Sequence, residues 1–417
     1  MEKYKEYKDS VMQWLGEIPS HWKIRKMKYT FIERSEKNHP HEEPLCATQS
    51  KGVIPQSLYE GRVVVVNKGF EGLKLVKVGD FVISLRSFQG GIEYAYYQGI
   101  ISAAYTVLQP KDANMAPFFK YLFKSHDYVQ LLQTCVTGIR EGQNINYPLL
   151  SKKAIPLPPL VEQHSIVSYL DTKCSQLDTL LSNKEKEISL LQEMKQRVIA
   201  DAVTRGINPS VKFKTTNIPW LQEIPEHWGK VKLKVLTLEG KNKNNENLET
   251  NVLSLSYGKI IRKKNINDGL VPSDYATYQI VDVDDIILRL TDLQNDHRSL
   301  RCGLVKERGI ITSAYVCLKI RQGVSEYFYF LLHSFDIKKV FYSMGGGLRQ
   351  SINYTEVSKL HVPVPPLSEQ RSIVSYITER ASKIDLLIEK LNKEIESIKE
   401  YKQRLISDVV TGQVKVC

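Results

Sequence analysis

The segment WLGEIPSHW at residues 14–22 reappears as WLQEIPEHW at residues 220–228. A second segment, IPLPPLVEQ at residues 155–163, reappears as VPVPPLSEQ at residues 362–370. Between these anchors the two copies of the sequence diverge. Such internal similarity indicates a tandem pseudo-repeat in which each copy forms one structural unit. Two copies with the same anchor segments and different sequences between them favour a protein that recognises two different parts of one extended ligand.

Length and composition fit ordinary globular domains. The 417 residues suffice for two or three domains, each with its own core. Hydrophobic residues make up 42% and charged residues 25% of the chain, as is usual in globular proteins. The formal charge of +12 lowers the free energy of approach to a polyanion such as nucleic acid, although mildly basic proteins without such a ligand are common.

The sequence shows no signal of a membrane or secreted protein. It contains no apolar run of about 18 residues, the length that a transmembrane helix needs. The charged start at residues 1–8 does not resemble a signal peptide. The six cysteines form no C-x-x-C pair, which is typical of reduced thiols in the cytosol. We therefore expect a cytoplasmic protein with no membrane partner and no metal site.

Each copy is expected to end in a long helix. Apolar positions there alternate at spacings of three and four residues over many turns, which is typical of a coiled-coil seam. The first stripe is Val167, Leu170, Cys174, Leu177, Leu181, Lys184, Ile188, Leu191, Lys195, Val198 and Ala202, and the second is Val374, Ile377, Ala381, Ile384, Ile388, Leu391, Ile395, Ile398, Lys402, Leu405 and Val409.

Both helices carry start and stop signals. Glu162 and Glu369 follow a Pro-Pro-Leu segment and place negative charge at the positive end of each helix. Gly206 and Gly412 supply stops at the other ends. Because the stripes match, we expect the helices to pack against each other antiparallel, with one globular stretch at either end. The alternative is that each helix pairs with a different protein.

The globular stretches are expected to be mixed α and β. Strands are predicted at residues 61–66, 76–85, 101–108, 281–290 and 311–318, and short helices at 117–133 and 326–342. Asp282, Asp284 and Asp285 could suggest a metal site, but Asp80 is the only acidic residue among the three equivalent positions of the first copy. A turn leading into a strand is the favoured interpretation.

No catalytic motif is present in the sequence. It has no phosphate-binding loop of the G-x-x-x-x-G-K-[ST] type and no G-x-G-x-x-G segment after a strand. It has no H-E-x-x-H and no G-x-S-x-G motif. We therefore predict no catalytic residues. Two alternatives stay open: an enzyme with a divergent nuclease or methyltransferase site, and a DNA-independent coiled-coil adaptor.

Two pairs of polar loops occupy matched places in the copies and carry different side chains. Arg reads guanine and Gln or Asn reads adenine in the major groove, whereas Ser and Thr more often hold phosphates. The candidates after the predicted strands are Arg86, Ser87, Gln89 and Tyr94 in the first copy and Arg289, Thr291, Gln294, Asn295, Arg298 and Arg301 in the second. Those before the second anchors are Arg140, Gln143 and Asn144, and Arg349 and Gln350. The Ile-Asn-Tyr that both copies share there is expected to be structural.

The anchors, the long helices ending in Ala-Val-Thr-Arg-Gly (202–206) and Val-Val-Thr-Gly (409–412), and the tandem layout resemble the DNA-specificity subunit of type I restriction–modification systems. The resemblance covers essentially the whole chain. It implies an α+β fold in which two mixed α/β target-recognition domains are joined by two long antiparallel coiled-coil helices. The expected divisions are a first recognition domain at 1–156, a first helix at 157–206, a second recognition domain at 207–362 and a second helix at 363–417.

The resemblance also implies function and partners. Each domain would read one half of an asymmetric, interrupted site in double-stranded DNA. Two methyltransferase subunits would bind the chain and methylate adenine with S-adenosylmethionine, and ATP-driven restriction subunits could join them. The chain itself would bind no cofactor, since S-adenosylmethionine, ATP and magnesium would lie on the partner subunits. The helices keep exposed apolar side chains that we expect to contact the methyltransferases, namely Leu180, Leu190, Met194, Leu387 and Tyr401.

Overall fold

The computed structural model describes residues 2–61, 69–137, 144–263, 275–293, 300–344 and 351–416. The chain forms two compact units. Unit 1 comprises Met1–Glu185 and Asn392–Cys417, and unit 2 comprises Lys186–Leu391. Helix α6 (Leu160–Arg205) and helix α10 (Leu367–Val410) each contribute one segment to both units. Each unit is therefore built from one globular stretch and from parts of both helices.

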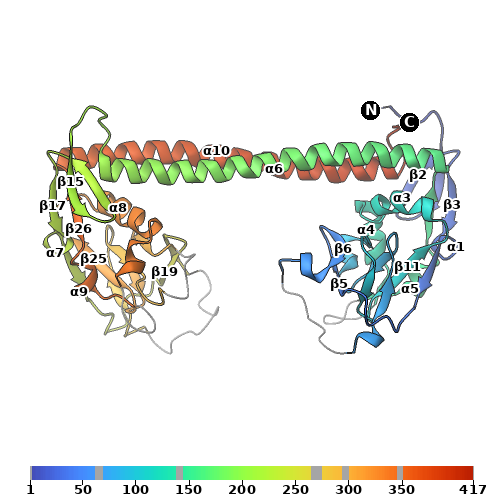
Figure 1. Ribbon diagram of the computed structural model, residues 1–417, viewed down its shortest axis with the longest axis horizontal. Coiled ribbons are helices and arrows are strands. Elements are labelled where there is room, and N and C mark those ends of the chain that lie inside the picture. The colour runs from blue at the N-terminus through green and yellow to red at the C-terminus, as the bar shows by residue number, and fades with distance from the viewer. Residues whose placement is uncertain are drawn as a thin grey trace. The chain divides into compact units, whose positions relative to one another are not determined.

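Unit 1 is a mixture of short strands and helices below its two long helical segments (Figure 1). Its other elements are β1 (Tyr7–Met12), β2 (Leu15–Pro19), β3 (Lys23–Lys26), α1 (Met27–Thr30), β4 (Phe31–Arg34), β5 (Leu45–Thr48), β6 (Gly52–Pro55), η1 (Gln56–Leu58), η2 (Phe70–Gly72), β7 (Lys74–Val76), β8 (Phe81–Ile83), α2 (Ser87–Gly90), β9 (Glu93–Tyr94), β10 (Gly99–Ile101), β11 (Thr106–Pro110), η3 (Ala113–Met115), α3 (Ala116–Leu122), α4 (His126–Gln133), β12 (Val136–Thr137), β13 (Asn144–Ile145), α5 (Tyr147–Leu150) and β14 (Ala154–Leu157).

Unit 2 repeats this plan. Its elements are β15 (Phe213–Ile218), β16 (Leu221–Pro225), β17 (Gly229–Lys232), α7 (Leu233–Leu236), β18 (Thr237–Gly240), β19 (Leu253–Ser256), β20 (Lys259–Arg262), β21 (Gln279–Val281), β22 (Ile286–Leu288), β23 (Cys302–Leu304), β24 (Gly309–Ile311), β25 (Val316–Ile320), α8 (Ser325–Ile337), η4 (Val340–Ser343), α9 (Tyr354–Val357) and β26 (His361–Val364).

The central sheets of the two units have the same order. Strands β4-β11-β8-β9 form the antiparallel sheet of unit 1, and β18-β25-β22-β23 form that of unit 2. Pairing alone thus reproduces the repeat that the anchors predict. The expected mixed α and β character of the globular stretches is confirmed. The strand predicted at 61–66 lies almost entirely outside the described residues.

A tight turn divides each predicted long strand into two. Residues 76–85 separate into β7 and β8 around Gly79, and residues 281–290 separate into β21 and β22 around Asp284, both with positive φ. The carboxylate of Asp80 accepts the Lys77 backbone N–H at 2.9 Å, and that of Asp285 accepts the Asp282 N–H at the same distance. The aspartates therefore build the turn into the strand, as the comparison between copies predicted.

The repeated anchors meet in space at the start of each long helix. The Trp22 indole N–H donates to Glu162 at 3.0 Å, and His21 Nε2 lies 2.8 Å from the same carboxylate. The equivalent indole of Trp228 donates to Glu369 at 3.0 Å, with His227 again at 2.8 Å. Strand β3 pairs with β14, and β17 with β26, so each lead-in segment is also held against the strand that precedes its helix. The motifs recur because they bind each other.

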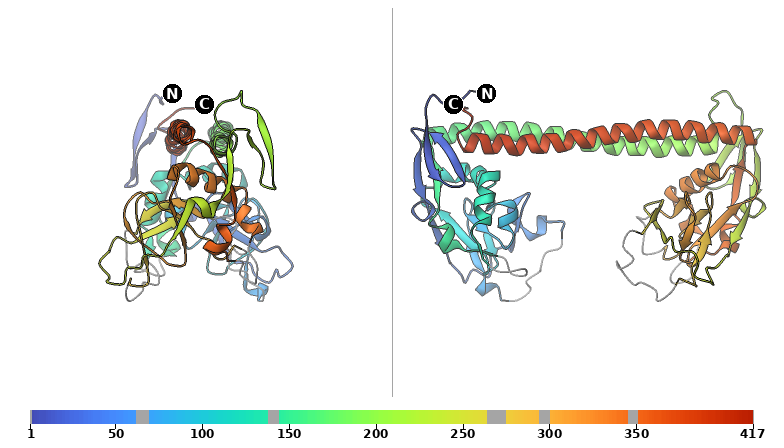
Figure 2. Two further views of the ribbon diagram at one scale, coloured as in Figure 1. Left: turned by 90° about the vertical axis from the view of Figure 1, so that its left-hand side faces the viewer. Right: turned by 180° about the vertical axis from the view of Figure 1, so that it is seen from behind.

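The two helices run antiparallel within each unit, and their apolar stripes face each other. Lys402 of α10 binds Asp178 of α6 at 2.6 Å in unit 1. Lys195 of α6 binds Asp385 of α10 at 2.7 Å in unit 2, so the two helices exchange roles between the units. All described positions of both predicted stripes are buried or half-buried. Figure 1 and both views of Figure 2 show the segments side by side, which confirms the predicted seam within each unit.

Each helix pair belongs to the core of its unit. Helices α3 and α4 lie between the central sheet and the long helices of unit 1 (Figure 1). Leu405 and Val409 of α10 belong to the hydrophobic core of unit 1. Ile199 and Val203 of α6 belong to the core of unit 2, to which α8 also contributes. The Tyr327 hydroxyl donates to the Val203 carbonyl at 3.0 Å. Each globular stretch therefore packs on the end of one long helix and on the start of the other.

The two ends of the chain lie together in unit 1 (Figure 2). The backbone N–H of Lys415 donates to the Glu2 carbonyl at 2.9 Å. The Tyr7 hydroxyl donates to the carbonyl of Gly412, which has positive φ and ends α10. The last residues of the chain therefore contact the segment that contains β1 in unit 1.

Glu162→Ala should loosen the attachment of β3 and β14 to α6. It leaves the buried Trp22 N–H without an acceptor and also removes the bond from the Tyr4 hydroxyl, at a cost of about 1–3 kcal/mol. Hydrogen–deuterium exchange of the β3 and β14 amides measures the loss. Glu369→Ala should cost less, because Glu369 is less buried. Glu187→Ala on the exposed face of α6 is the control, and equal exchange in Glu162→Ala and this control would contradict the expectation.

Candidate nucleic-acid interface

The first pair of candidate loops begins where two equivalent strands end. Ile83 of β8 and Leu288 of β22 are the last residues of these strands by their pairing with β11 and β25. Arg289 is therefore the first residue of its loop, whereas Arg86 is the third of its own. Arg86 is exposed and Arg289 is half-buried. The two arginines start from matched strands but occupy different loop positions.

The loop of unit 1 is closed by two serines. The Ser84 backbone N–H donates to the Ser87 hydroxyl at 2.8 Å, and α2 then carries the chain to Gly91. Ser87 is buried, so its hydroxyl shapes the loop, which corrects the expectation that it faces a ligand. Arg86 and Gln89 are exposed on this loop and keep their place as candidates.

Arg301 holds the loop of unit 2. From the sequence it was expected to be one of the side chains that contact DNA. Arg301 is fully buried. Its guanidinium donates to the carbonyls of Arg289 at 3.1 Å, Thr291 at 2.7 Å and Asp292 at 3.2 Å, and to the Tyr342 hydroxyl at 3.0 Å. Its planar set of donors is engaged by the loop backbone and by Tyr342 of η4. Arg301 therefore positions the loop, and this corrects the expectation that it contacts bases.

The second pair of loops lies beside the first pair. In unit 1, α2 is adjacent to β13, where Asn144 is exposed. In unit 2, the Ile352 backbone N–H donates to the Leu290 carbonyl at 2.9 Å, which ties residues 351–352 to the loop of Arg289. Each unit thus brings two segments that are far apart in sequence to one polar edge.

The shared Ile-Asn-Tyr is structural, as predicted. Asn146 accepts the Leu149 N–H at 3.0 Å and caps α5, and Asn353 accepts the Glu356 N–H at 3.0 Å and caps α9. Half-buried Thr291 remains in the described part of the loop of unit 2. The other candidates lie outside the described residues: Arg140, Gln143, Gln294, Asn295, Arg298, Arg349 and Gln350.

Tyr94 faces the interior of unit 1 instead of the loop edge. Its ring lies 5.4 Å from that of Phe81 and 4.9 Å from that of Tyr96. With Tyr96 and Tyr121 it lines a cavity of about 450 Å³ between the globular stretch and the helix pair. Burial raises the pKa of the Tyr94 phenol, which therefore stays neutral. Tyr94, given as a DNA-binding candidate by its place in the sequence, therefore lies away from the loop edge.

The same cavity contains a buried ion pair. Glu93 lies 2.6 Å from Lys124, and burial raises the pKa of Glu93 to about 7 although Lys124 lowers it. In unit 2 the position equivalent to Glu93 is Gly303, and His333 lies near Lys195 of α6. Burial, with a smaller contribution from Lys195, lowers the pKa of His333 to about 4, so that its ring is neutral. The two interiors are therefore packed with different polar groups behind equivalent frames.

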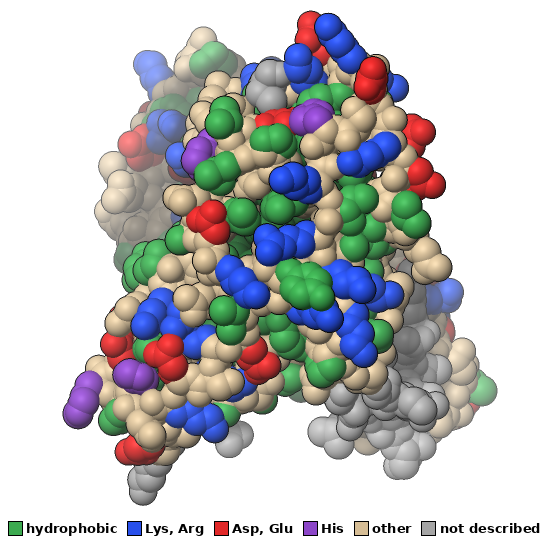
Figure 3. Space-filling view, turned by 90° about the vertical axis from the view of Figure 1, so that its right-hand side faces the viewer, with side chains coloured by type: hydrophobic (Ala, Val, Ile, Leu, Met, Phe, Trp, Pro, Cys, Tyr) green, Lys and Arg blue, Asp and Glu red, His purple; other side chains and the backbone are tan. Residues whose placement is uncertain are grey.

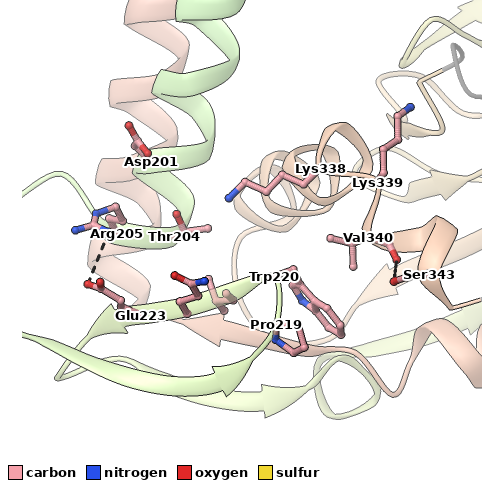
Figure 4. Close-up of a pocket in the computed structure, with 12 residues that line it drawn as sticks. Asp201, Thr204, Arg205, Pro219, Trp220, Glu223, Lys338, Lys339, Val340 and Ser343 are labelled. Atoms are coloured by element: carbon pink, nitrogen blue, oxygen red, sulfur yellow. Dashed lines mark hydrogen bonds and ion pairs between the residues drawn. The ribbon is translucent and has the colours of Figure 1, made fainter.

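A groove of about 620 Å³ lies in unit 2 where α6 meets the hairpin β15–β16 and η4 (Figure 4). Arg205 pairs with Glu223 at 3.7 Å on one side, and the Ser343 hydroxyl donates to the Val340 carbonyl at 2.8 Å on the other. Lys338 extends toward α6 (Figure 4). The Arg205–Glu223 pair therefore links α6 to β16, whereas the Ser343 bond lies within η4. Within the described ranges, no three His, Cys, Asp or Glu side chains gather in a way that could hold a metal ion.

The sequence profile of the type I restriction modification DNA specificity domain matches residues 19–190 and again residues 225–397. The chain belongs to this specificity family. The two matches cover most of the chain and coincide with the two copies of the repeat.

Known specificity subunits match most of this chain. The putative type I restriction enzyme MjaX specificity subunit of Methanocaldococcus jannaschii is 25% identical over 96% of both chains. The MjaVIII specificity subunit of the same organism is 27% identical over 82% of this chain and 80% of its own. A chain solved in work on complex assembly and conformational transition of the type I R-M system superposes with a TM-score of 0.69 over 95% of this chain and 99% of its own, at 14% identity. That structural likeness concerns the fold.

The long helices of this chain carry exposed apolar side chains outside the predicted coiled-coil seam. Leu180 and Tyr401 are exposed in unit 1, and Leu190, Met194 and Leu387 are exposed in unit 2, each by 43% or more. All five lie outside the two predicted stripes, and their contact with methyltransferase subunits stays a prediction. Among the described residues, no helix is both long enough and apolar enough to cross a membrane.

Two structural contacts were not predicted from the sequence: those of the helix-start glutamates and those of Arg301. The Glu162 and Glu369 carboxylates were expected to favour the helix start, and the structure adds that they bind Trp22 and Trp228 of the other anchor. The joint repetition of both anchors was the available signal for that contact. The role of Arg301 had no such signal, because its partners are backbone carbonyls.

Proposed function

We propose that this chain is the DNA-specificity subunit of a type I restriction–modification complex and that each unit reads one half of an interrupted duplex site. The observation that carries the proposal is the pair of adjacent polar loops on each of two equivalent frames. The frames match in strand order and in anchor contacts, whereas the loops differ in residue type and in how they are held. Loops with different side chains on matching strands and anchors suit a DNA site whose two halves differ in sequence.

The long helices would set the distance between the two half-sites. Helix α6 has 46 residues and α10 has 44, and both belong to the cores of both units. At about 1.5 Å per residue, each helix is roughly 65–70 Å long. Two readers attached to such a rod would accept only half-sites whose separation suits it, near whole turns of about 34 Å.

The chemistry would reside on partner subunits. Two methyltransferase subunits would use S-adenosylmethionine to methylate adenine, and restriction subunits with ATP and magnesium could join them in the cytoplasm. The absence of catalytic motifs from the sequence and the structural use of Ser87, Glu93 and Arg301 support a subunit that binds DNA without transforming it.

Arg289→Ala should weaken recognition of one base position in the second half-site only. Loss of a bidentate base contact costs about 1–3 kcal/mol. Binding selections on duplexes with randomised half-sites measure it. Arg86→Ala is the matched variant and should relax only the first half-site. A uniform loss over all sequences would mean that Arg289 holds a phosphate instead.

Removing one facing heptad from each helix should change the preferred spacer. The Asp178–Lys402 pair shows that residues 177–183 of α6 face residues 396–402 of α10. Deleting both blocks shortens the rod by about 10 Å, or about three base pairs. Selection on duplexes with randomised spacers should show a shorter spacer or no binding, and duplication of both blocks should lengthen it. If both variants keep the original spacer preference, the helices do not set the distance between the half-sites.

Exposed apolar side chains on α6 should bind the methyltransferase subunit. A carboxylate at the centre of such an interface is desolvated without a partner, so Leu190→Glu with Met194→Glu should weaken binding at least tenfold, or about 1.4 kcal/mol. Co-purification of the chain with the methyltransferase subunit of its own system tests this. Ser189→Glu, an exposed neighbour, is the control. Equal recovery of the partner with both variants would exclude this surface.

A further inference from the structure

Three lysines recur at equivalent positions of the two frames and lie outside the readout loops. Lys26, Lys28 and Lys152 of unit 1 correspond to Lys232, Lys234 and Lys359 of unit 2 by their places in β3 and β17, α1 and α7, and the turns before β14 and β26. All six are exposed. We call each set of three a basic frame face.

Backbone contacts bring the three lysines of unit 1 together. The Met27 N–H donates to the Lys153 carbonyl and the Lys28 N–H to the Ser151 carbonyl, both at 3.0 Å, while Lys26 pairs with Ala154 across the β3–β14 ladder. Exposed Lys23 and Arg25 extend the same strand. Figure 3 shows lysine and arginine side chains gathered on this side of unit 1.

Unit 2 uses the same contacts. The Leu233 N–H donates to the Leu360 carbonyl at 2.8 Å, and the Lys234 N–H donates to the Ser358 carbonyl at 2.9 Å. Strand β17 pairs with β26 as β3 pairs with β14. The basic frame face is therefore a feature of the repeat and not of one globular stretch.

Charge, not packing, is what the matched lysines share. Among the described residues, none of the six ammonium groups lies in an ion pair. Neighbouring positions differ between the copies: exposed Arg25 corresponds to half-buried Val231, and exposed Tyr29 to exposed Val235. Lysines also protect exposed strand edges from pairing with other chains, and this second explanation is one that experiment can separate from binding.

Each basic frame face adjoins a readout loop. In unit 1 the single turn of α5, capped by Asn146, separates the loop that contains Asn144 from Lys152. In unit 2 the single turn of α9, capped by Asn353, separates residues 351–352 from Lys359. One helical turn advances the chain by only about 5 Å, so the lysines follow shortly after the loop in each unit.

We propose that the two basic frame faces bind backbone phosphates of the same duplex whose bases the loops read. The proposal rests on the proposed function and adds a contact that does not depend on base sequence. Phosphate contacts fix the orientation of a protein on the duplex, and an invariant frame is suited to a ligand group that is the same at every site. The variable loops would then recognise the base sequence, and the lysines of the frame would position the protein on the duplex.

The test is the salt dependence of binding to a random-sequence duplex by the full chain. Each phosphate contact adds about 0.9 to the slope of log K against log salt concentration. Replacing Lys26, Lys28 and Lys152 with Gln should lower that slope by up to about 2.7, and the Gln triple at Lys232, Lys234 and Lys359 should do the same. The control triple replaces Lys37, Lys173 and Lys399, which are exposed elsewhere in unit 1, and should leave the slope unchanged.

The outcomes separate the explanations. A reduced slope with unchanged base preference, restored when the three lysines are replaced with Arg, supports the proposal. A slope equal to that of the control overturns it, whether or not the Gln variant aggregates, and aggregation alone would assign the lysines to edge protection. If the unmodified chain does not bind duplex DNA under any salt condition, the proposed function itself fails. Circular dichroism of the variants shows that they remain folded.

Discussion

The contact between an indole N–H and a glutamate at the start of each long helix holds the two ends of each copy together. Glu162 and Glu369 lie in the first turn of α6 and α10, where the helix end favours negative charge. Each carboxylate accepts a hydrogen bond from the tryptophan of the lead-in segment. The lead-in pairs in turn with the strand that precedes the helix. A short stretch at the beginning of each copy is thereby fixed to its end, and the intervening sequence is free to differ.

That arrangement explains why frame and loops have diverged so unequally. The frame must satisfy buried polar groups, such as the indole N–H of Trp22 and the amide of Gln163, which donates to the Pro158 carbonyl at 2.8 Å. An unsatisfied buried donor is costly, so these residues are constrained in both copies. The loops need only a stable backbone, and the two units achieve it differently. One uses a pair of serines, and the other uses the guanidinium of Arg301.

Much of the fold was predictable because it depends on local spacing. Every position that the three-and-four pattern assigned to the seam is buried or half-buried, and comparison of Asp80 with Asp285 predicted the turn that the structure shows. The candidate site was less accessible to prediction. Arg301 and Ser87 are chemically suited to contact a ligand, and only the three-dimensional neighbours show that their donors and acceptors are used internally. Tyr94 was misplaced for a related reason: sequence distance from the loop did not reveal the cavity beneath the helices.

The nearness of residues 2 and 415 in unit 1 makes this place suitable for an engineered peptide junction. The Lys415 backbone N–H donates to the Glu2 carbonyl at 2.9 Å, so a short peptide could join the two segments without displacing either. The stretch 207–210 between α6 and β15 is exposed, and exposed connections tolerate an opening of the backbone. A circularly permuted chain opened there would keep the packing contacts of both units, because those contacts do not require a covalent link between α6 and β15.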